Sequence, residues 1–346
     1  MFSIKSLATA TTALSLIASS HATYYPESTS NLAVYWGQGA NQATLAEFCK
    51  DSPVEIVPVA FINRFTAQAN GWVGDNYGNA CWAGEYKAPG WPTTANYTPD
   101  NDKLYTTCQP VREGIPACQG SGKKVILSLG GAWSLVGSPY QLTGRDEGNA
   151  LAEFLWGAYG TYDANSDYIL AGNPRPLDGG LLGTDGTHID IDGFDFDIEH
   201  APTDGGEGYI ACIKRLRELF TAKGLPNKQY MITGAPQCIY PDANMGSMIA
   251  GVQFDALFIQ FYNSEQCAAN NPGFNFDQWT EITGPSANAK LYIGLLGSPA
   301  ASTAVNSTGG SYYVPTADAK ALIQAYSMHE KFGGVMVWEA TTATQN

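Results

Sequence analysis

The chain has 346 residues, a length that suits one barrel domain of about 250 residues with insertions, or two smaller domains. Hydrophobic residues make up 44% of the chain and charged residues 14%, which is typical of a folded globular protein and argues against a disordered one. The formal net charge is −14. Such an acidic surface repels phosphate backbones and anionic lipids, so we expect neither nucleic acid nor a membrane as a partner.

The first 22 residues have the pattern of a secretory signal peptide. Lys5 supplies the positive start, residues 7–18 form a short run of apolar and small residues, and cleavage is expected after Ala22. The run is too short to span a bilayer. Two acceptor sequons, at Asn96 and Asn306, agree with secretion into the extracellular space or the cell wall. We therefore expect residues 23–346 to form the mature protein, as a monomer.

The chain contains seven cysteines and four histidines. Most cysteines of a secreted protein form disulfides, and an odd number leaves at least one of them free. Cys212 is the best candidate, because it lies at a helical position where a buried thiol packs like a small apolar side chain. The sequence has no Cys-x-x-Cys pair, which argues against a zinc site, and we expect no metal and no cofactor.

Short apolar runs alternate along the chain with amphipathic helical patterns, which is typical of a parallel sheet with helical connections. Strands are predicted at residues 32–36, 54–62, 124–129, 191–198, 229–234, 256–262, 290–295 and 334–338. Helices are predicted at 44–50, 146–159, 208–223 and 317–331. Eight strands without a glycine-rich nucleotide loop favour a single-domain (β/α)8 TIM barrel over an open sheet.

Two segments depart from a simple barrel. Residues 71–120 are rich in Trp, Gly, Pro and Tyr and carry three cysteines, so we predict a disulfide-held excursion after the second strand. Only eight residues follow Trp338, whereas an average helix has about 12. Either the barrel closes without its final helix or the sequence is truncated there.

The most informative segment is the predicted strand that ends in Asp-Gly-Phe-Asp-Phe-Asp-Ile-Glu at residues 192–199. Strand side chains alternate between two faces, so Asp195, Asp197 and Glu199 share one of them. The apolar residues between them share the other. In a barrel the apolar face packs against the helices, and the acidic face points into the lumen and its mouth.

These carboxyl groups are too close together to be ionised without cost. Neighbours on one strand face lie about 6.6 Å apart. At an effective dielectric of about 20, two full charges at that distance repel by about 2.5 kcal/mol, or nearly two pKa units. At least one of the three should therefore keep its proton near neutral pH, as a general acid must. We assign that role to Glu199, the outermost and longest, with Asp197 orienting it and Asp195 tuning it from below.

A second carboxylate normally lies across the scissile bond of a glycosidase. Glu339, after the last predicted strand, is one candidate. Alternatively, an N-acetyl oxygen of the substrate itself attacks the anomeric carbon, and the protein supplies only an acid and groups that hold the acetamido group.

Six motifs in the same order resemble glycoside hydrolase family 18, and within it the plant and fungal class III type of chitinase. The resemblance runs from about Asn31 to Glu339. The motifs are Y-W-G-Q at 35–38, S-L-G-G at 128–131, D-G-F-D-F-D-I-E at 192–199, G-A-P-Q-C at 234–238, Q-F-Y-N at 260–263 and G-G-V-M-V-W at 333–338.

The resemblance implies an endo-acting chitinase that cuts β-1,4 linkages of chitin or N-acetylglucosamine oligomers by a retaining, substrate-assisted mechanism. Glu199 would be the acid and then the base, while Asp197 and Tyr262 would position the acetamido group. Trp338 would form the floor beneath the sugar that is cut. Tyr35, Gln38, Gln260 and Asn263 match positions near that sugar. The resemblance also implies the disulfides Cys49–Cys118, Cys81–Cys108 and Cys238–Cys267.

Two other functions remain open on the same barrel. An endo-N-acetylglucosaminidase acting on N-glycans uses the same acidic strand, and a lectin or enzyme inhibitor uses an inactive one. Such inactive barrels usually lack the terminal Glu or its Asp partner, whereas Glu199, Asp197 and Tyr262 are all present here.

Overall fold

The computed structural model describes residues 23–50, 52–69, 71–81, 84–86, 104–135, 138–178 and 186–344. The predicted signal peptide and the sequon at Asn96 lie outside these residues. Within the described ranges, none of the helices has both the length and the apolar character needed to cross a bilayer.

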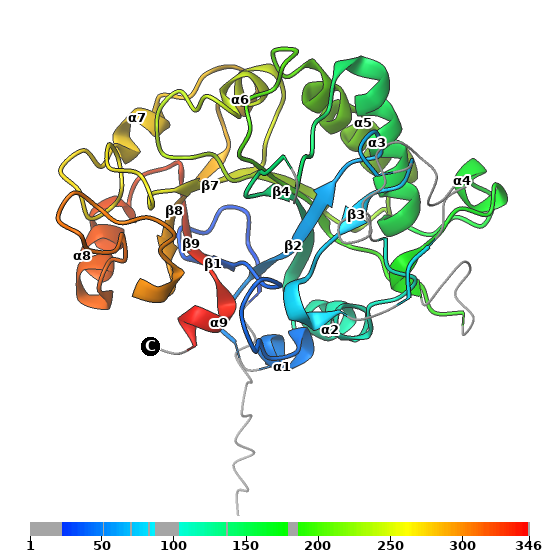
Figure 1. Cartoon of the computed structure of the whole chain (residues 1–346), viewed down its shortest axis with the longest axis horizontal. Helices are drawn as coiled ribbons and strands as arrows, with labels where there is room; N and C mark the ends of the chain where they lie inside the picture. The colour runs from blue at the N-terminus through cyan, green and yellow to red at the C-terminus, as the bar shows by residue number, and fades with distance from the viewer. Residues whose placement is uncertain are drawn as a thin grey trace, which may run out of the picture.

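Eight parallel strands close into a barrel, which confirms the predicted (β/α)8 fold. Figure 1 shows the closed ring of strands with helices around it. Each strand pairs with the next one along the chain, and the last pairs with the first. A short antiparallel strand, β3 (Gly74–Asp75), adds to the outer end of the second barrel strand. The barrel strands are β1 (Asn31–Val34), β2 (Ile56–Arg64), β4 (Lys124–Gly131), β5 (Gly193–Ile198), β6 (Met231–Gly234), β7 (Ala256–Gln260), β8 (Lys290–Leu296) and β9 (Phe332–Trp338).

Helices follow the barrel strands and surround them (Figure 1). Three of the four predicted helices agree with the structure to within two residues, and the fourth ends at Tyr326 rather than 331, because a turn at 327–331 leads directly into β9. The helices are α1 (Leu45–Lys50), α2 (Gln109–Gly120), α3 (Gly144–Tyr159), α4 (Asp167–Leu170), α5 (Glu207–Lys223), α6 (Gly246–Gly251), α7 (Phe276–Thr280), α8 (Thr316–Tyr326) and α9 (Ala340–Ala343). A single helical turn, α9, thus follows the last strand.

The apolar core has two parts, one between the barrel and its helices and one inside the barrel. The apolar face of β5 belongs to the outer part, where Phe194 stacks on Phe220 of α5 with ring centroids 6.5 Å apart. The inner part contains Tyr35, Phe258 and Met336. Asp195 lies on the opposite face of β5 from Phe194 and is fully buried in the lumen. The strand alternation in the sequence therefore predicts correctly which face of β5 is acidic and inward.

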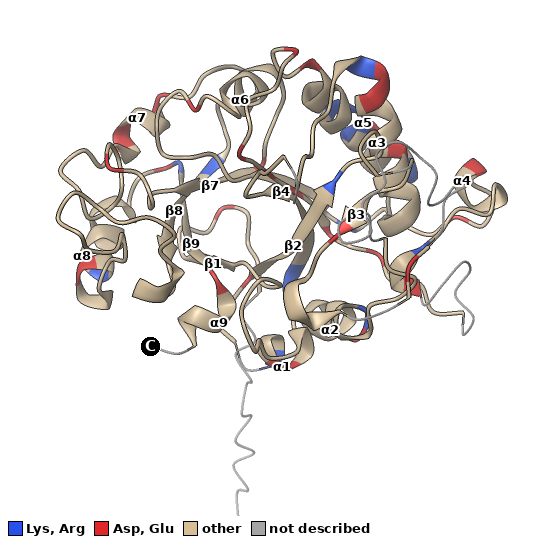
Figure 2. Cartoon of the chain, viewed as in Figure 1, with Lys and Arg blue, Asp and Glu red and all other residues tan. Residues whose placement is uncertain are grey.

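The two longest described helices are α3 and α5, which lie before and after β5 in the chain. They pack closely against each other. A Cβ atom at Gly148 of α3 would lie 2.2 Å from the carbonyl oxygen of Gly208, so only glycine permits this approach. On their outer faces, Nε of Arg215 donates to Glu153 at 2.7 Å and its Nη1 to Glu218 at 2.6 Å. Figure 2 shows this mixture of both charges on α3 and α5.

Two of the three implied disulfides are formed. Cys49–Cys118 joins α1 to α2, with an S–S distance of 1.99 Å, and Cys238–Cys267 joins the loops after β6 and β7. The third is not formed: Cys81 and Cys108 are free, buried thiols. Their sulfur atoms are neighbours at hydrogen-bonding rather than bonding separation, and this contact raises the pKa of the Cys108 thiol. Cys212 is free and buried, as predicted.

The predicted excursion at 71–120 ends in a helix that the sequence analysis does not predict. Pro110 lies in the first turn of α2, and Val111, Ile115 and Cys118 place a buried stripe at helical spacing. The other described parts are short, namely β3 and a bridge between Glu85 and Tyr105. Of the three cysteines in this segment, only Cys118 forms a disulfide, and it lies within this helix.

Asn306, the second sequon, lies in the loop after β8 and is half-buried. Its Oδ1 accepts hydrogen bonds from the backbone of Thr308 and Gly310, and its Nδ2 donates to the carbonyl oxygen of Ser311 at 3.3 Å. Glycosylation at Asn306 stays a prediction.

Asp75 of β3 makes the stability of the fold depend on pH. Its side chain is buried, and Oδ1 accepts a hydrogen bond from the backbone N–H of Tyr105 at 3.2 Å. Burial raises the pKa of Asp75 to about 7. Because the folded pKa lies above the unfolded value, stability is fully present below about pH 4 and is lost as pH rises through 7.

We therefore expect the melting temperature of the protein to fall between pH 4 and pH 8, and Asp75→Asn to weaken this fall. Three pKa units correspond to at most about 4 kcal/mol. Thermal unfolding at both pH values, followed by circular dichroism, measures the effect. The same slope in the variant and in the unchanged protein would refute the role of Asp75.

Candidate active site

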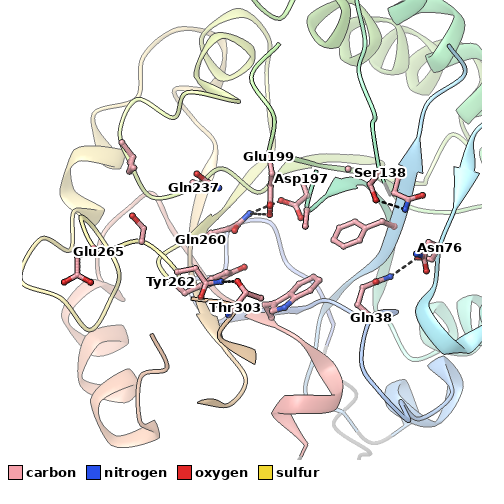
Figure 3. A pocket seen from close by; sticks show the side chains of 18 of the residues that line it. Gln38, Asn76, Ser138, Asp197, Glu199, Gln237, Gln260, Tyr262, Glu265 and Thr303 are labelled. Carbon is pink, nitrogen blue, oxygen red and sulfur yellow. Dashed lines mark hydrogen bonds between the residues drawn. The ribbon is translucent and has the colours of Figure 1, made fainter. Parts of the chain in front are cut away.

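A cavity of about 600 Å³ opens at the carboxyl ends of the barrel strands. This is the end at which enzymes of this architecture carry their active sites. Figure 3 shows its lining, to which seven of the predicted site residues contribute. They are Gln38, Asp197, Glu199, Gln260, Tyr262, Asn263 and Trp338.

Asp195 lies beneath the cavity and does not line it. Hydroxyl groups from three other strands or their ends donate to its carboxylate: Tyr35 Oη and Ser128 Oγ to Oδ2, both at 2.7 Å, and Thr233 Oγ1 to Oδ1 at 2.6 Å. Burial raises the pKa of Asp195, while these three donors act in the opposite direction. Asp195 therefore lies deeper in the lumen than the cavity, and its influence on Glu199 stays a prediction.

Tyr35, which was expected near the sugar, does not line the cavity. Tyr35 is only 1% exposed, and its hydroxyl is engaged by Asp195 rather than pointing into the cavity. Its ring packs against that of Trp338, with centroids 5.6 Å apart. Tyr35 therefore supports the site from below, because it comes from a lower level of the barrel than the mouth.

Gln260, at the end of β7, connects the two outer carboxyl groups of the acidic strand. Its Nε2 donates to Asp197 Oδ1 at 2.9 Å, to Glu199 Oε1 at 3.3 Å and to the carbonyl oxygen of Ala235 at 2.9 Å. Figure 3 shows the Gln260 amide pointing at Glu199, with Asp197 beside it. One amide group therefore holds both carboxyl groups on the same wall of the cavity.

All three carboxyl groups of the strand titrate above their usual range. Burial raises the pKa of Asp197 well above its ordinary value, and repulsion from Glu199 and Asp195 adds to it. Burial also raises the pKa of Glu199, and the nearby buried Asp242 adds a smaller contribution, while the Gln260 amide opposes both. Asp197 and Glu199 titrate as a coupled pair, so the shared proton belongs to the pair. The raised pKa values favour the protonated form of the pair, which is the form that a general acid needs.

Removing the Gln260 amide is expected to raise the pKa values of this pair. A donor to a carboxylate stabilises the ionised form, so Gln260→Met takes away that stabilisation from both partners. We expect the alkaline limb of the kcat/KM profile to move to higher pH. A pH–rate profile of the variant measures this shift, and a limb that stays in place or moves to lower pH would contradict it.

The floor of the cavity is aromatic. Trp338, at the end of β9, stacks on Phe61 of β2 with centroids 5.8 Å apart and an interplanar angle of 20°. Both rings line the cavity, as does Tyr262, which is 8% exposed. Burial, followed by the charges of Asp197 and Glu199, raises the pKa of Tyr262 well above 10, so its hydroxyl keeps its proton.

The predicted amides Gln38 and Asn263 are partly used within the protein. Gln38 Nε2 donates to the carbonyl oxygens of Ala60 and Asn76, at 2.9 and 2.8 Å. Asn263 Nδ2 donates to Thr303 Oγ1 at 2.9 Å, across to the loop after β8. Both residues line the cavity, but they also fix the loops that form its walls.

Glu339, the candidate for a second carboxylate, caps a helix. Its side chain accepts hydrogen bonds from the backbone N–H groups of Thr341 and Thr342, at 3.1 and 3.0 Å, at the start of α9. It is 4% exposed and does not line the cavity. The carboxylate is therefore held where it satisfies the end of a helix.

Other cavity residues come from loops that the sequence analysis did not single out. Asn63 follows Phe61 by two positions at the end of β2, and its Nδ2 donates to Ser138 Oγ at 3.1 Å. The place of Asn63 at the carboxyl end of a barrel strand is a signal that could have pointed to it. Asn76, Gln237, Glu265 and Thr303 also line the cavity, and no local pattern marks them.

Fold and site together define a (β/α)8 barrel with a row of carboxyl groups at the mouth, the arrangement of a barrel hydrolase. Residues 31–323 match the family Glycosyl hydrolases family 18. The chain belongs to this family.

Among curated relatives, the sequence is 39% identical over 330 residues to Endochitinase A of Aspergillus niger, covering 92% of this chain and 23% of that protein. It is also 39% identical over 352 residues to Endochitinase A of Emericella nidulans, covering 98% of this chain and 33% of that protein. The chain thus spans less than half the length of these relatives.

Solved structures with the same fold include a xylanase and alpha-amylase inhibitor protein from Scadoxus multiflorus, with a TM-score of 0.66, 26% identity and coverage of 91% of this chain and 94% of that one. The ICChI chitinase from Ipomoea carnea has a TM-score of 0.65 and 23% identity over 90% of this chain and 96% of that one. The second likeness concerns the fold alone. The first is to a protein named as an inhibitor, so the fold does not by itself imply catalysis.

Proposed function

We propose that this protein is a secreted, monomeric, endo-acting chitinase, and that it hydrolyses β-1,4 linkages between N-acetylglucosamine units by a retaining, substrate-assisted mechanism. The observation that carries the proposal is the pair Asp197 and Glu199 on one wall, joined by the Gln260 amide. The family membership and the relatives named endochitinases support it.

The lack of a facing carboxylate among the described cavity residues favours attack by the substrate. Among the described residues that line the cavity, the only carboxyl group besides Asp197 and Glu199 is that of Glu265. Glu265 accepts hydrogen bonds from Ser307 and Tyr312, and Figure 3 shows it apart from Glu199, at the far end of the cavity. A retaining glycosidase with its own nucleophile needs a second carboxylate about 5 Å from the acid. The acetamido oxygen of the substrate takes that role.

In the first step, Glu199 gives its proton to the glycosidic oxygen as the bond to the anomeric carbon breaks. The acetamido oxygen attacks that carbon from the opposite face and forms an oxazolinium ion. In the second step, Glu199, now ionised, takes a proton from water as the water oxygen attacks the same carbon. The bond from this carbon to the acetamido oxygen breaks, which restores the neutral acetamido group. Two inversions leave the configuration retained.

The remaining residues position the reacting sugar. Asp197 accepts the acetamido N–H, and the Tyr262 hydroxyl, which keeps its proton, donates to the acetamido oxygen. The Trp338 and Phe61 rings offer an apolar face to the sugar's C–H groups. Because the acetamido group is held in a near-attack geometry, the nucleophile does not have to be brought from solution. This lowers the activation free energy by several kcal/mol.

Product analysis on a soluble N-acetylglucosamine hexamer tests the proposal. We expect internal cuts, with products in the β-configuration when they are observed by NMR before mutarotation. A parallel assay on a glycoprotein with high-mannose N-glycans tests the endo-N-acetylglucosaminidase alternative. Release of the glycan with no cleavage of the hexamer would show that N-glycans, and not chitin, are the substrate. No activity on either substrate would favour a lectin or an enzyme inhibitor.

A further inference from the structure

Tyr140 lies under the wall that carries Glu199, and no step described above uses it. Its side chain is fully buried. Its hydroxyl donates to the carbonyl oxygen of Gly131 at 2.6 Å and accepts a hydrogen bond from the backbone N–H of Glu199 at 2.8 Å. One hydroxyl group thus joins the last residue of β4 to the residue that follows β5.

The Tyr140 hydroxyl takes the place of the next backbone hydrogen bond between β4 and β5. The paired register of β4 and β5 ends at Gly131 and Ile198, and Glu199 is the next residue along β5. A tyrosine hydroxyl has a single proton. Because that proton goes to Gly131, the oxygen is left to receive the N–H of Glu199. Burial raises the pKa of Tyr140, so the proton stays in place throughout the working range of an enzyme.

Tyr140 is itself held in place on both sides. Its ring packs against that of Phe65, with centroids 5.5 Å apart. The next residue, Gln141, donates its backbone N–H to Gln68 Oε1 at 3.2 Å. Tyr140 and Gln141 are therefore anchored where they meet the acidic strand.

On the basis of the proposed function, we propose that Tyr140 is a positioning residue: its hydroxyl fixes the backbone of Glu199 and so sets the direction in which the acid enters the cavity. The residue touches no substrate. It acts through the peptide N–H of the acid, at the point where the strand pairing ends and the chain would otherwise be free to turn.

Tyr140→Phe tests this inference, because it removes one oxygen atom and keeps the ring. With the link gone, the Glu199 carboxyl occupies its productive position for less of the time. We expect kcat on the soluble hexamer to fall by on the order of tenfold to a hundredfold, with KM within about twofold. A less firmly buried Glu199 also loses part of its raised pKa, so the alkaline limb of kcat/KM should move to lower pH.

Tyr159→Phe is the matched control. Tyr159, at the end of α3, is also fully buried, and its hydroxyl has no hydrogen-bond partner among the described residues. It does not line the cavity. We expect this variant to keep the kcat and the pH profile of the unchanged protein. Melting temperatures of both variants, with assays run well below them, separate the loss of folded protein from the loss of turnover.

A lowered melting temperature in Tyr140→Phe, with kcat and the pH profile unchanged, would overturn the inference and leave Tyr140 a purely structural residue. Equal losses of kcat in both variants would overturn it as well. These outcomes differ from a failure of the proposed function, which would appear as an inactive unchanged protein or a fully active Glu199→Gln variant.

Discussion

Glu199→Gln is expected to lower kcat on chitin oligomers by on the order of 10²- to 10⁴-fold, the contribution typical of a general acid. The amide has nearly the same size and shape as the carboxyl group, but it cannot transfer a proton to the leaving oxygen. Its oxygen can still accept the hydrogen bond from Gln260 that Glu199 Oε1 receives at 3.3 Å. We therefore expect the fold to remain intact and substrate binding to persist.

Steady-state kinetics give kcat and KM of the variant, and thermal unfolding gives its melting temperature; together they test this expectation. Glu218→Gln serves as a control for the loss of one carboxylate, because Glu218 is exposed on α5 and pairs with Arg215 far from the chemistry proposed here. Full activity in Glu199→Gln would show that another residue supplies the proton. A collapse of the melting temperature would instead assign Glu199 a role in stability.

Asp197→Asn is expected to have the second-largest effect, a loss of kcat on the order of 10²-fold. Asp197 is 4% exposed and shares the Gln260 amide with Glu199. An Asn side chain can present its NH₂ group where the acetamido N–H needs an acceptor, so the nucleophile of the substrate is no longer aligned.

The pH profile of Asp197→Asn shows whether the variant loses activity because the carboxyl pair is broken or because the site is distorted in general. Repulsion from Glu199 helps to raise the pKa of Asp197, and the two titrate together. Without the second charge, Glu199 should titrate in a single step and at lower pH, which moves the alkaline limb downwards. A loss of activity with an unchanged profile would mean that the two carboxyl groups do not share a proton.

The sequence predicts the architecture and the acidic wall well, because both depend on local periodicity. Eight short apolar runs give the barrel, and the alternation at 192–199 places Asp195, Asp197 and Glu199 on the inward face. The short helices α6 and α7 were missed, since six and five residues span less than two helical turns and show little of a helical period, although α1, with six residues, was predicted. The helix α2 was missed because it follows a long segment of turn-forming residues.

Contacts between distant strands could not be predicted in the same way. Tyr140 and Glu199 are 59 positions apart, and nothing local in either segment indicates that a hydroxyl meets a backbone N–H. Gln260 reaches Glu199 across 61 positions. Strand periodicity gives the face of a residue but not its depth in the barrel, which is why Tyr35 was expected at the cavity and is found beneath it.

Glu339 illustrates a further limit of sequence reasoning. A carboxylate after the last barrel strand is at the right end of the molecule for catalysis, yet here the same position begins a helix. Two backbone N–H groups at the start of α9 bind it. Residue type and strand order are the same for both roles, and only the direction of the side chain separates them.

The most direct test of substrate assistance changes the nucleophile and leaves the protein alone. Aryl glycosides of N-acetylglucosamine oligomers carry an acetyl, a difluoroacetyl or a trifluoroacetyl group on the nitrogen of the sugar that is cut. Fluorine withdraws electrons from the carbonyl oxygen. If that oxygen attacks the anomeric carbon, kcat/KM must fall steeply along the series. A rate that stays level from acetyl to trifluoroacetyl would contradict the mechanism, because the nucleophile would then have to come from the protein or from water.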